Sequence, residues 1–267
     1  MSLELSCQSP GPLPVDLEGF APDRFQGKSL DDIKRFEVSV GNAKVTAGEL
    51  FNVEGDPSDA AWVFTGDLSG AQNIGSEMAS GRIQVDGAAG RYAGARMRGG
   101  ELCIAGDAAD LLGAELRGGT IVVGGDAGDQ IGGPLPGSRL GMCGGTIRVH
   151  GSAGEAVGQA MRRGWITVGG DCGQLAGYRM RAGSLCVFGA CGSRPGAEMV
   201  RGTIGLFGDR SPTLLPTFRP GCEYSPQFLQ LMANELNAYG HRTPQRVLLH
   251  SGDLLTGGRG EILLPLP

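Results

Sequence analysis

The chain has 267 residues, 49 of them glycine, and carries a net charge of −5 at pH 7. This acidic balance argues against a nucleic-acid-binding protein, and no stretch approaches the roughly 18 consecutive apolar residues of a membrane span. The high glycine content is typical of collagen or a flexible linker, but the sequence lacks a Gly-X-Y period and is 40% hydrophobic, so a packed core is expected.

The first residues, MSLELSCQSPGPLPVDLEG, lack the basic and apolar regions of a secretory signal. Seven cysteines occur without a CxxC pair, a pattern that favours reduced thiols and a cytoplasmic location. We expect residues 1–45 to form an N-terminal cap that contains a short strand, Leu3–Ser6, a proline-rich loop and the segment SLDDIKRFEVSV.

The middle of the chain is an internal repeat. A glycine precedes an apolar strand at Gly81, Gly100, Gly119, Gly145, Gly164, Gly183 and Gly202. The spacing is 19 residues except for one interval of 26, which contains seven extra residues, Gly133–Arg139. Degenerate copies are expected at Ala61–Asp67 and at Gly48–Asp56. A fixed period near 20 residues is the signature of a solenoid, whose units bury their apolar faces by stacking.

Each copy contains a triplet such as Ile83-Gln84-Val85, with aliphatic outer residues and a variable middle one. This alternation indicates a strand with one buried face, and 19 residues are too few for a βαβ unit. We therefore predict an all-β chain, a right-handed parallel β-helix of about 7–9 coils over residues 46–210, because each unit must stack on its neighbours.

Further columns of the repeat predict its interior. Three residues before each of the seven glycines that precede a strand lie Met78, Met97, Leu116, Met142, Met161, Met180 and Met199, which we assign to core packing. A column of small residues, Ala89, Ala108, Ala127, Ala153, Cys172 and Cys191, is expected to point inward at a tight corner. The stacked Cys172 and Cys191 are predicted to be a buried thiol pair, with a disulfide as the alternative.

A Gly-x-x-Gly-x-x-x-Gly pattern follows each strand, as at Gly87, Gly90 and Gly94. We expect each of these glycines to permit either a positive φ or a close approach of two backbones.

The composition changes after residue 210, and residues 211–267 are predicted to be a C-terminal extension that packs on the solenoid or on a partner. Apolar residues at helical spacing predict a helix over about 225–239, with Ser225 as N-cap. The tail RVLLHSGDLLTGGRGEILLPLP predicts a final apolar strand.

The sequence contains no recognisable catalytic motif. The three histidines, His150, His241 and His250, form no HxH or HExxH motif, and the cysteines lack zinc spacing. We therefore predict neither a catalytic residue nor a metal site in this chain. A carboxylate column, Asp107, Asp126, Asp171 and Asp209, is expected to cap turn N–H groups, with cation binding as the alternative.

The least ordinary column is basic, and consists of Arg98, Arg117, Arg162 and Arg181. Like charges stacked at strand spacing repel one another, so a compensating group is expected. One interpretation is a solvated corner in which the guanidinium groups pair with Glu101, Glu115 or other local acids. The other is a surface for an anionic partner or ligand, held by fork-like hydrogen bonds.

The repeat M-R-G-G-x-(I/L)-x-(I/V)-x-G-D-A-G-x-x-x-G resembles the C subunit of formylmethanofuran dehydrogenase, from about Lys44 to Asp209. It is also similar to the GxxGxxxG domain of glutamate synthase. Length favours the stand-alone C subunit. The excess of arginine over lysine and the C-terminal extension favour the kind found in the bacterial formyltransferase/hydrolase complex.

That resemblance implies a non-catalytic structural subunit in one-carbon metabolism of methylotrophs. In the complex, a formyl group passes from formyl-tetrahydromethanopterin to methylofuran and is then hydrolysed to formate. The implied partners are a formyltransferase subunit, a zinc amidohydrolase subunit and a B subunit, with methylofuran and zinc held elsewhere in the complex. The alternatives are the C subunit of a molybdenum or tungsten formylmethanofuran dehydrogenase, and the β-helix of a glutamate-synthase-like system.

Methylofuran-type cofactors carry a glutamate-rich tail, which the arginine column matches chemically. The resemblance therefore adds the hypothesis that Arg98, Arg117, Arg162 and Arg181 hold that tail or line its path.

Overall fold

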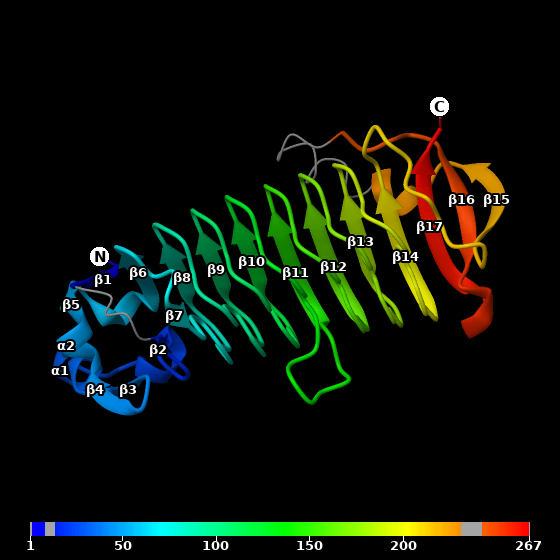
Figure 1. Cartoon of the computed structure of the whole chain (residues 1–267). Coiled ribbons are helices and arrows are strands. Elements are labelled where there is room, and N and C mark those ends of the chain that lie inside the picture. The colour runs from blue at the N-terminus through cyan, green and yellow to red at the C-terminus, as the bar shows by residue number, and fades with distance from the viewer. Residues whose placement is uncertain (1, 9–13, 231–241, 267) are drawn as a thin grey trace.

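The computed structural model describes residues 2–8, 14–230 and 242–266 (Figure 1). Its strands are β1 (Leu3–Cys7), β2 (Val15–Asp16), β3 (Glu37–Val40), β4 (Ala43–Thr46), β5 (Phe51–Glu54), β6 (Ala61–Thr65), β7 (Ala71–Gln72), β8 (Arg82–Val85), β9 (Glu101–Ile104), β10 (Thr120–Val123), β11 (Cys143–Val149), β12 (Arg163–Val168), β13 (Ser184–Val187), β14 (Arg201–Leu206), β15 (Arg219–Tyr224), β16 (Val247–Gly252) and β17 (Arg259–Pro265). The helical elements are short: η1 (Pro22–Phe25), α1 (Leu30–Lys34), α2 (Ala47–Leu50), η2 (Pro57–Asp59) and η3 (Leu254–Thr256). The prediction of an all-β chain is confirmed.

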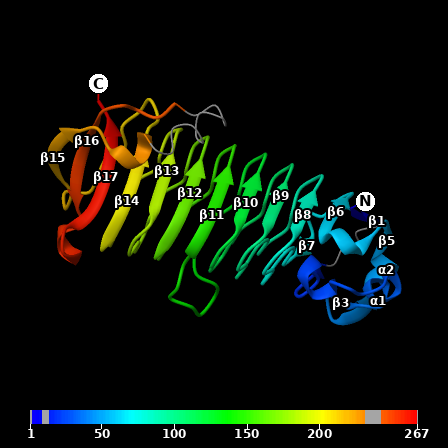
Figure 2. The ribbon, with the colours of Figure 1, turned by 180° about the vertical axis from the view of Figure 1, so that it is seen from behind.

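Strands of the repeat stack in chain order. In the described part of the chain, thirteen strands form one mixed sheet, in which β6 and β8 through β14 each pair in parallel with the next (Figures 1 and 2). The register aligns the aliphatic residues predicted from the sequence: Ile83, Leu102, Ile121, Ile147, Ile166, Leu185 and Ile204. A second line of parallel bridges joins Leu68, Ala89, Ala108, Ala127, Ala153, Cys172 and Cys191.

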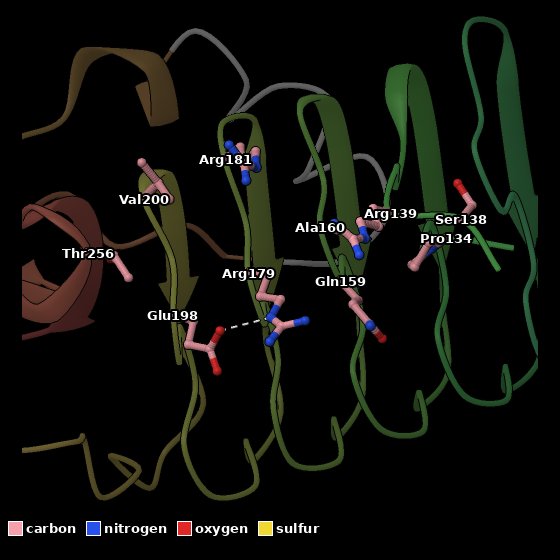
Figure 3. A pocket seen from close by; sticks show the side chains of 10 residues that line it. All are labelled: Pro134, Ser138, Arg139, Gln159, Ala160, Arg179, Arg181, Glu198, Val200 and Thr256. Atoms are coloured by element: carbon pink, nitrogen blue, oxygen red, sulfur yellow. Dashed lines mark hydrogen bonds and ion pairs between the residues drawn. The ribbon is translucent and has the colours of Figure 1, made fainter. Parts of the chain in front are cut away.

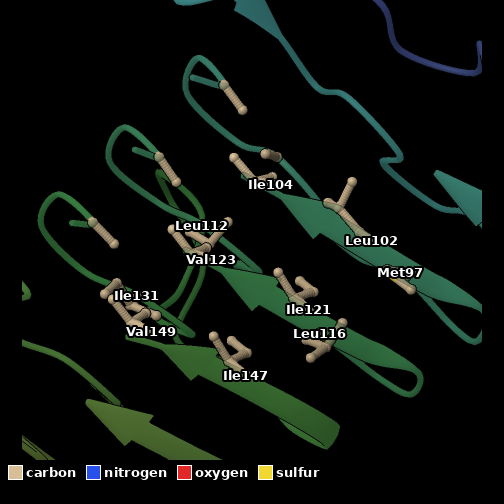
Figure 4. Close-up of a cluster of buried hydrophobic side chains, with 14 of the residues drawn as sticks. Met97, Leu102, Ile104, Leu112, Leu116, Ile121, Val123, Ile131, Ile147 and Val149 are labelled. Carbon is tan, nitrogen blue, oxygen red and sulfur yellow. The ribbon is translucent and has the colours of Figure 1, made fainter. Parts of the chain in front are cut away.

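The interior of the stack is made of the predicted columns. The methionine column is fully buried, with 0% exposure from Met78 through Leu116 to Met199. Figure 4 shows how Met97 and Leu116 lie beside the strand residues Leu102, Ile121 and Ile147. The prediction that this column is core is confirmed, and the unbranched methionine side chain suits the gaps between stacked repeats.

Glycines of the GxxGxxxG pattern have two separate roles. The third one has a left-handed backbone, with φ of +66° at Gly94 and +59° at Gly113. The first and second lie against the previous repeat: a Cβ on Gly106 would come within 2.9 Å of the Gly87 carbonyl carbon. Both expected reasons for glycine therefore apply, at different positions of the motif.

The sequence pattern did not predict that residues on both sides of the third glycine are left-handed too. Tyr92 has φ +64° and Arg96 has φ +54°, although such a backbone costs an ordinary residue about 1–2 kcal/mol. The N–H groups of Tyr92 and Arg96 donate to the following repeat, whereas that of Gly94 donates back to Ile74 in the preceding one. The alternation thus provides inter-repeat hydrogen bonds outside the regular strands.

At the N-terminal end, β1 pairs in parallel with β6 and antiparallel with β5. The copy at Ala61–Asp67 therefore joins the parallel stack as predicted, but the copy at Gly48–Asp56 does not, and that prediction is wrong. The inserted β1 separates β5 from the stack, and β5 runs in the reverse direction. Beneath these strands lies an aromatic cluster that includes Phe20 and Trp62, whose ring centroids are 4.8 Å apart.

At the C-terminal end, β17 continues the sheet by pairing in parallel with β14, while β16 and β15 add antiparallel strands. The predicted final apolar strand is confirmed. Of the predicted helix over 225–239, residues 227–230 are helical and the remainder beyond 230 lies outside the described residues. Phe228 and Leu229 pack in a cluster with Trp165 and Cys186 on the outer side of the sheet.

Candidate functional site

Metal-ligating side chains are scattered along the chain. Within the described residues, no group of three or more His, Cys, Asp or Glu side chains is arranged to hold a metal ion. No helix in that same part of the structure has the length and apolarity that a membrane crossing requires. His250 on β16 is a single partly buried imidazole whose pKa is lowered by burial. The chemistry of this chain is therefore best sought in its charged surface.

The arginine column is assembled as the sequence predicts, and we call Arg98, Arg117, Arg162 and Arg181 the arginine ladder. Their backbone N–H groups donate to Met78, Met97, Met142 and Met161 of the preceding repeats, respectively. All four residues are exposed. Cys143 occupies the middle position of the column, where its N–H donates to Leu116, so the ladder consists of two arginine pairs separated by a thiol.

The acidic residues that were expected to pair with the ladder form ion pairs with other arginines. Glu101 forms an ion pair with Arg82 at 2.6 Å, and Glu115 lies 3.5 Å from Arg96. No ion pair joins a ladder arginine to any carboxylate among the described residues. The ion pairing with Glu101 and Glu115 is therefore not formed, and the four guanidinium groups are exposed, as the solvated-corner interpretation expects, without an ion-pair partner among the described residues.

The extra residues in the long repeat form a projecting segment, Gly133–Gly141, which we call the flanking loop (Figure 1). Its base is closed by a 2.8 Å hydrogen bond from the N–H of Met142 to the carbonyl of Gly132. Leu135 packs back on the buried Leu111 and Ala114 of the preceding repeat. The flanking loop is thus anchored at its base and along one side.

The second projection is η3, which precedes β17 and is separated from the flanking loop by the repeats of β12, β13 and β14. The buried Asp253 fixes it: one carboxylate oxygen accepts from the N–H of Leu255 and the other from the N–H of Glu198. The hydroxyl of Thr256 donates to the carbonyl of Met199. These bonds tie η3 to the repeat that precedes β14.

Between the two projections lies a cavity of about 550 Å³, which we call the basic groove (Figure 3). It is lined by Pro134, Ser138, Arg139, Gln159, Ala160, Arg179, Arg181, Glu198, Val200 and Thr256. The Nε of Arg179 donates to Glu198 at 2.8 Å, and this bond raises the pKa of Arg179. The lining therefore holds three guanidinium groups and one carboxylate, which is already paired.

Sequence reasoning identified two parts of this groove, Arg181 and the inserted loop, but not their combination. The third part, η3, is fixed by Asp253, which lies 55 residues from Glu198 in the chain and is brought close by the pairing of β17 with β14. The repeat pattern contains no signal for that approach.

Three members of the carboxylate column, Asp107, Asp126 and Asp171, cap backbone N–H groups as predicted, whereas Asp209 forms no such bond with the described residues. Asp107 accepts from the N–H of Asp126 at 2.8 Å, Asp126 from Ser152 at 2.7 Å, and Asp171 from Ala190 at 2.7 Å. In each case the donor belongs to the following repeat rather than to the same turn. These carboxylates are therefore structural links between repeats.

Cys172 and Cys191 lie in bridged positions as free thiols, but only Cys172 is buried and Cys191 is half-buried, so the predicted buried pair is confirmed in part. The hydrogen bond that joins them lowers the pKa of Cys191 and raises that of Cys172.

Comparison with known proteins gives a consistent relationship. No family model matches the sequence. The C subunit of the tungsten-containing formylmethanofuran dehydrogenase 2 of Methanothermobacter marburgensis is 38% identical over 84 residues, which is 30% of this chain and 31% of that protein. The C subunit of the molybdenum-containing formylmethanofuran dehydrogenase 1 of Methanothermobacter thermautotrophicus is 40% identical over 79 residues, 29% of this chain and 20% of that one. The chain thus spans a third or less of the length of these curated relatives.

A match to a solved structure extends over the whole chain. A chain of the formyltransferase/hydrolase complex (FhcABCD) from Methylorubrum extorquens, crystallised in complex with methylofuran, has a TM-score of 0.90 and 32% identity. The match covers 99% of this chain and 100% of that one. Together with the C-subunit relatives, this places the present chain in the family of formylmethanofuran dehydrogenase C subunits.

Proposed function

We propose that this chain is a non-catalytic structural subunit of a formyltransferase/hydrolase complex. The observation that carries the proposal is the end-to-end similarity to a chain of FhcABCD, because the dehydrogenase relatives match over less than a third of this chain. In such a complex a formyl group passes from formyl-tetrahydromethanopterin to methylofuran and is hydrolysed to formate. The formyltransferase and zinc amidohydrolase sites would lie on partner subunits in the cytoplasm, beside a B subunit.

The stacked repeats suit a scaffolding role, and we infer that they form a right-handed parallel β-helix. In-register parallel pairing from β6 to β14, and the second line of bridges through Ala89 and Cys172, support this inference. A stack whose repeats are tied by strands, left-handed segments and carboxylate links is a rigid rod. Such a rod offers long surfaces on which partner subunits can be held at fixed separation.

Zinc and methylofuran fit this chain differently. The described residues offer no cluster of zinc ligands, so the hydrolytic metal would be held by a partner. The arginine ladder, in contrast, fits a polycarboxylate: its four exposed guanidinium groups lack a described acidic partner and lie in two pairs, each at strand spacing. We therefore propose that Arg98, Arg117, Arg162 and Arg181 hold the glutamate-rich tail of methylofuran or line its path.

Purification tests the function directly. The chain is tagged in its native host and isolated gently, and the accompanying proteins are identified while formate release from formyl-tetrahydromethanopterin is measured. Recovery of a formyltransferase-like and an amidohydrolase-like subunit with formate release supports the proposal. Molybdopterin-containing partners would instead support the dehydrogenase, and a glutaminase with a flavin and iron-sulfur partner would support a glutamate-synthase-like system.

Replacement of two ladder residues tests the tail hypothesis. Arg117→Ala/Arg162→Ala should lower the methylofuran content of the purified complex, because two of the four cations are lost, while the subunits stay together. The matched control, Arg210→Ala/Arg219→Ala, removes two exposed arginines outside the ladder and should leave the content unchanged. Equal methylofuran content in both variants would overturn the hypothesis.

A further inference from the structure

Exposed leucines are chain neighbours of lining residues of the basic groove on both projections. Among the described residues, the large hydrophobic side chains most open to solvent are Leu140, Leu254 and Leu255, exposed by 42%, 46% and 83%. Leu140 follows the groove residue Arg139 on the flanking loop. Leu254 and Leu255 precede the groove residue Thr256 on η3. These leucines do not form one contiguous patch, so they serve as apolar contacts at the two ends of whatever the groove's charge binds.

Both projections are held in place, although neither belongs to the 19-residue repeat. The Met142–Gly132 hydrogen bond and the packing of Leu135 anchor the flanking loop, and Asp253 anchors η3 through the N–H of Glu198. A surface that is already ordered loses little conformational entropy on binding. The leucines are therefore presented at a fixed separation rather than on free chain ends.

The positive charge of the groove favours an anionic occupant. Arg139 and Arg181 have no carboxylate partner among the described residues, whereas Arg179 is paired with Glu198. Arginine forms bidentate hydrogen bonds with carboxylates and is enriched where proteins bind one another. Arg181 also ends the arginine ladder, so Arg139, which lies outside the ladder, is the guanidinium group specific to the groove. With the leucines on the two projections, it matches an acidic segment with apolar residues at its ends.

We propose that the basic groove, with Leu140 on one side and Leu254 and Leu255 on the other, docks an acidic peptide segment of a partner subunit. This inference rests on the proposed function, since it requires that the chain be part of a complex. Four repeat spacings separate the flanking loop from η3, a span of about 19 Å at about 4.8 Å for each strand spacing. An extended segment of about six residues, or a helix of about thirteen, bridges that distance.

The charge and the apolar contact are tested in the assembled complex. Arg139→Glu and Leu255→Asp change exposed side chains, one on each projection, and thermal unfolding of the isolated chain should be unchanged in both. Each variant should retain at least tenfold less of one partner subunit when the complex is purified through this chain. Arg210→Glu, an exposed charge reversal outside the groove, is the matched control and should retain every subunit.

Photo-crosslinking identifies the occupant. A benzoylphenylalanine placed at position 255 of the wild-type complex should crosslink to one partner peptide rich in Asp or Glu. Loss of methylofuran from Arg139→Glu with all subunits retained would overturn the docking proposal in favour of the cofactor tail. Full retention of subunits in both variants would also overturn it. These failures are distinct from failure of the proposed function, in which the wild-type chain itself would purify without partners.

Discussion

The carboxylate of Asp107 accepts a hydrogen bond from the backbone N–H of Asp126, which lies 19 residues further along the chain. Asp126 repeats the contact with Ser152, and Asp171 with Ala190. Each link joins one repeat to the next at the turn after the strand, where no continuous strand ladder is present. These links thus contribute to the stacking energy of the repeat.

Removal of one link should weaken the stack. Asp126→Ala deletes the acceptor of the Ser152 N–H, and we expect a loss of about 1–2 kcal/mol in the free energy of unfolding, at the lower end for a hydrogen bond to a charged group because this one is exposed. Asp126→Asn keeps an oxygen acceptor and should lose less. Urea unfolding of the isolated chain measures both, and equal stability of all three proteins would show that the link is unimportant.

Close approach between repeats predicts a sharp difference between two glycines. A Cβ on Gly118 would lie 2.2 Å from the carbonyl oxygen of Arg98, whereas one on Gly70 would meet nothing within 4 Å. Gly118→Ala should therefore destabilise the chain by about 1–3 kcal/mol. Gly70→Ala should be neutral or slightly stabilising, because it restricts the unfolded chain. A Gly118 variant with wild-type unfolding behaviour would contradict the stacking described here.

The methionine column makes its own prediction. Met97→Ala empties a fully buried position and should cost about 2–5 kcal/mol. Leu116→Met restores the residue that the rest of the column uses and should change stability by less than about 1.5 kcal/mol. Thermal unfolding compares the two, and a Met97 loss no larger than that of the exposed Leu255→Ala would argue against a core role.

Cysteine reactivity tests the electrostatics of the strand surface. Burial, followed by the neighbouring Glu101 carboxylate, raises the pKa of Cys103 to about 11. Because the thiolate is the reactive form, alkylation of Cys103 by iodoacetamide should be slow at pH 8. As long as the pH stays below the pKa, the rate should increase about tenfold for each unit by which the pH is raised. Glu101→Gln removes a negative neighbour, lowers the pKa and should speed the reaction at pH 9. Peptide mass spectrometry follows the modification, and an unchanged rate would contradict this assignment.

Local periodicity predicted the strands, the methionine column and the glycine positions because those features repeat every 19 residues. It also identified the arginine ladder, whose members occupy one position of the repeat. It could not predict which arginine pairs with Glu101, because both Arg82 and the ladder arginines lie in neighbouring repeats. Only the three-dimensional arrangement shows that the partner is Arg82.

The basic groove could not be predicted from the sequence for a related reason. Its η3 side depends on β17 pairing with β14, a contact between distant segments that no repeat encodes. The copy expected at Gly48–Asp56 failed likewise, because β1 from the start of the chain inserts between β5 and β6. Non-local strand pairing therefore marks the limit of what the sequence pattern predicts.

Native mass spectrometry of the complex purified through this chain tests the central claim most directly. The structural-subunit account predicts a single assembly that contains this chain with a formyltransferase-like and an amidohydrolase-like subunit, and that retains methylofuran. Its formate-releasing activity should map to the partners, and the isolated chain should have none. Recovery of the chain alone, or with molybdopterin-containing subunits, would contradict the account.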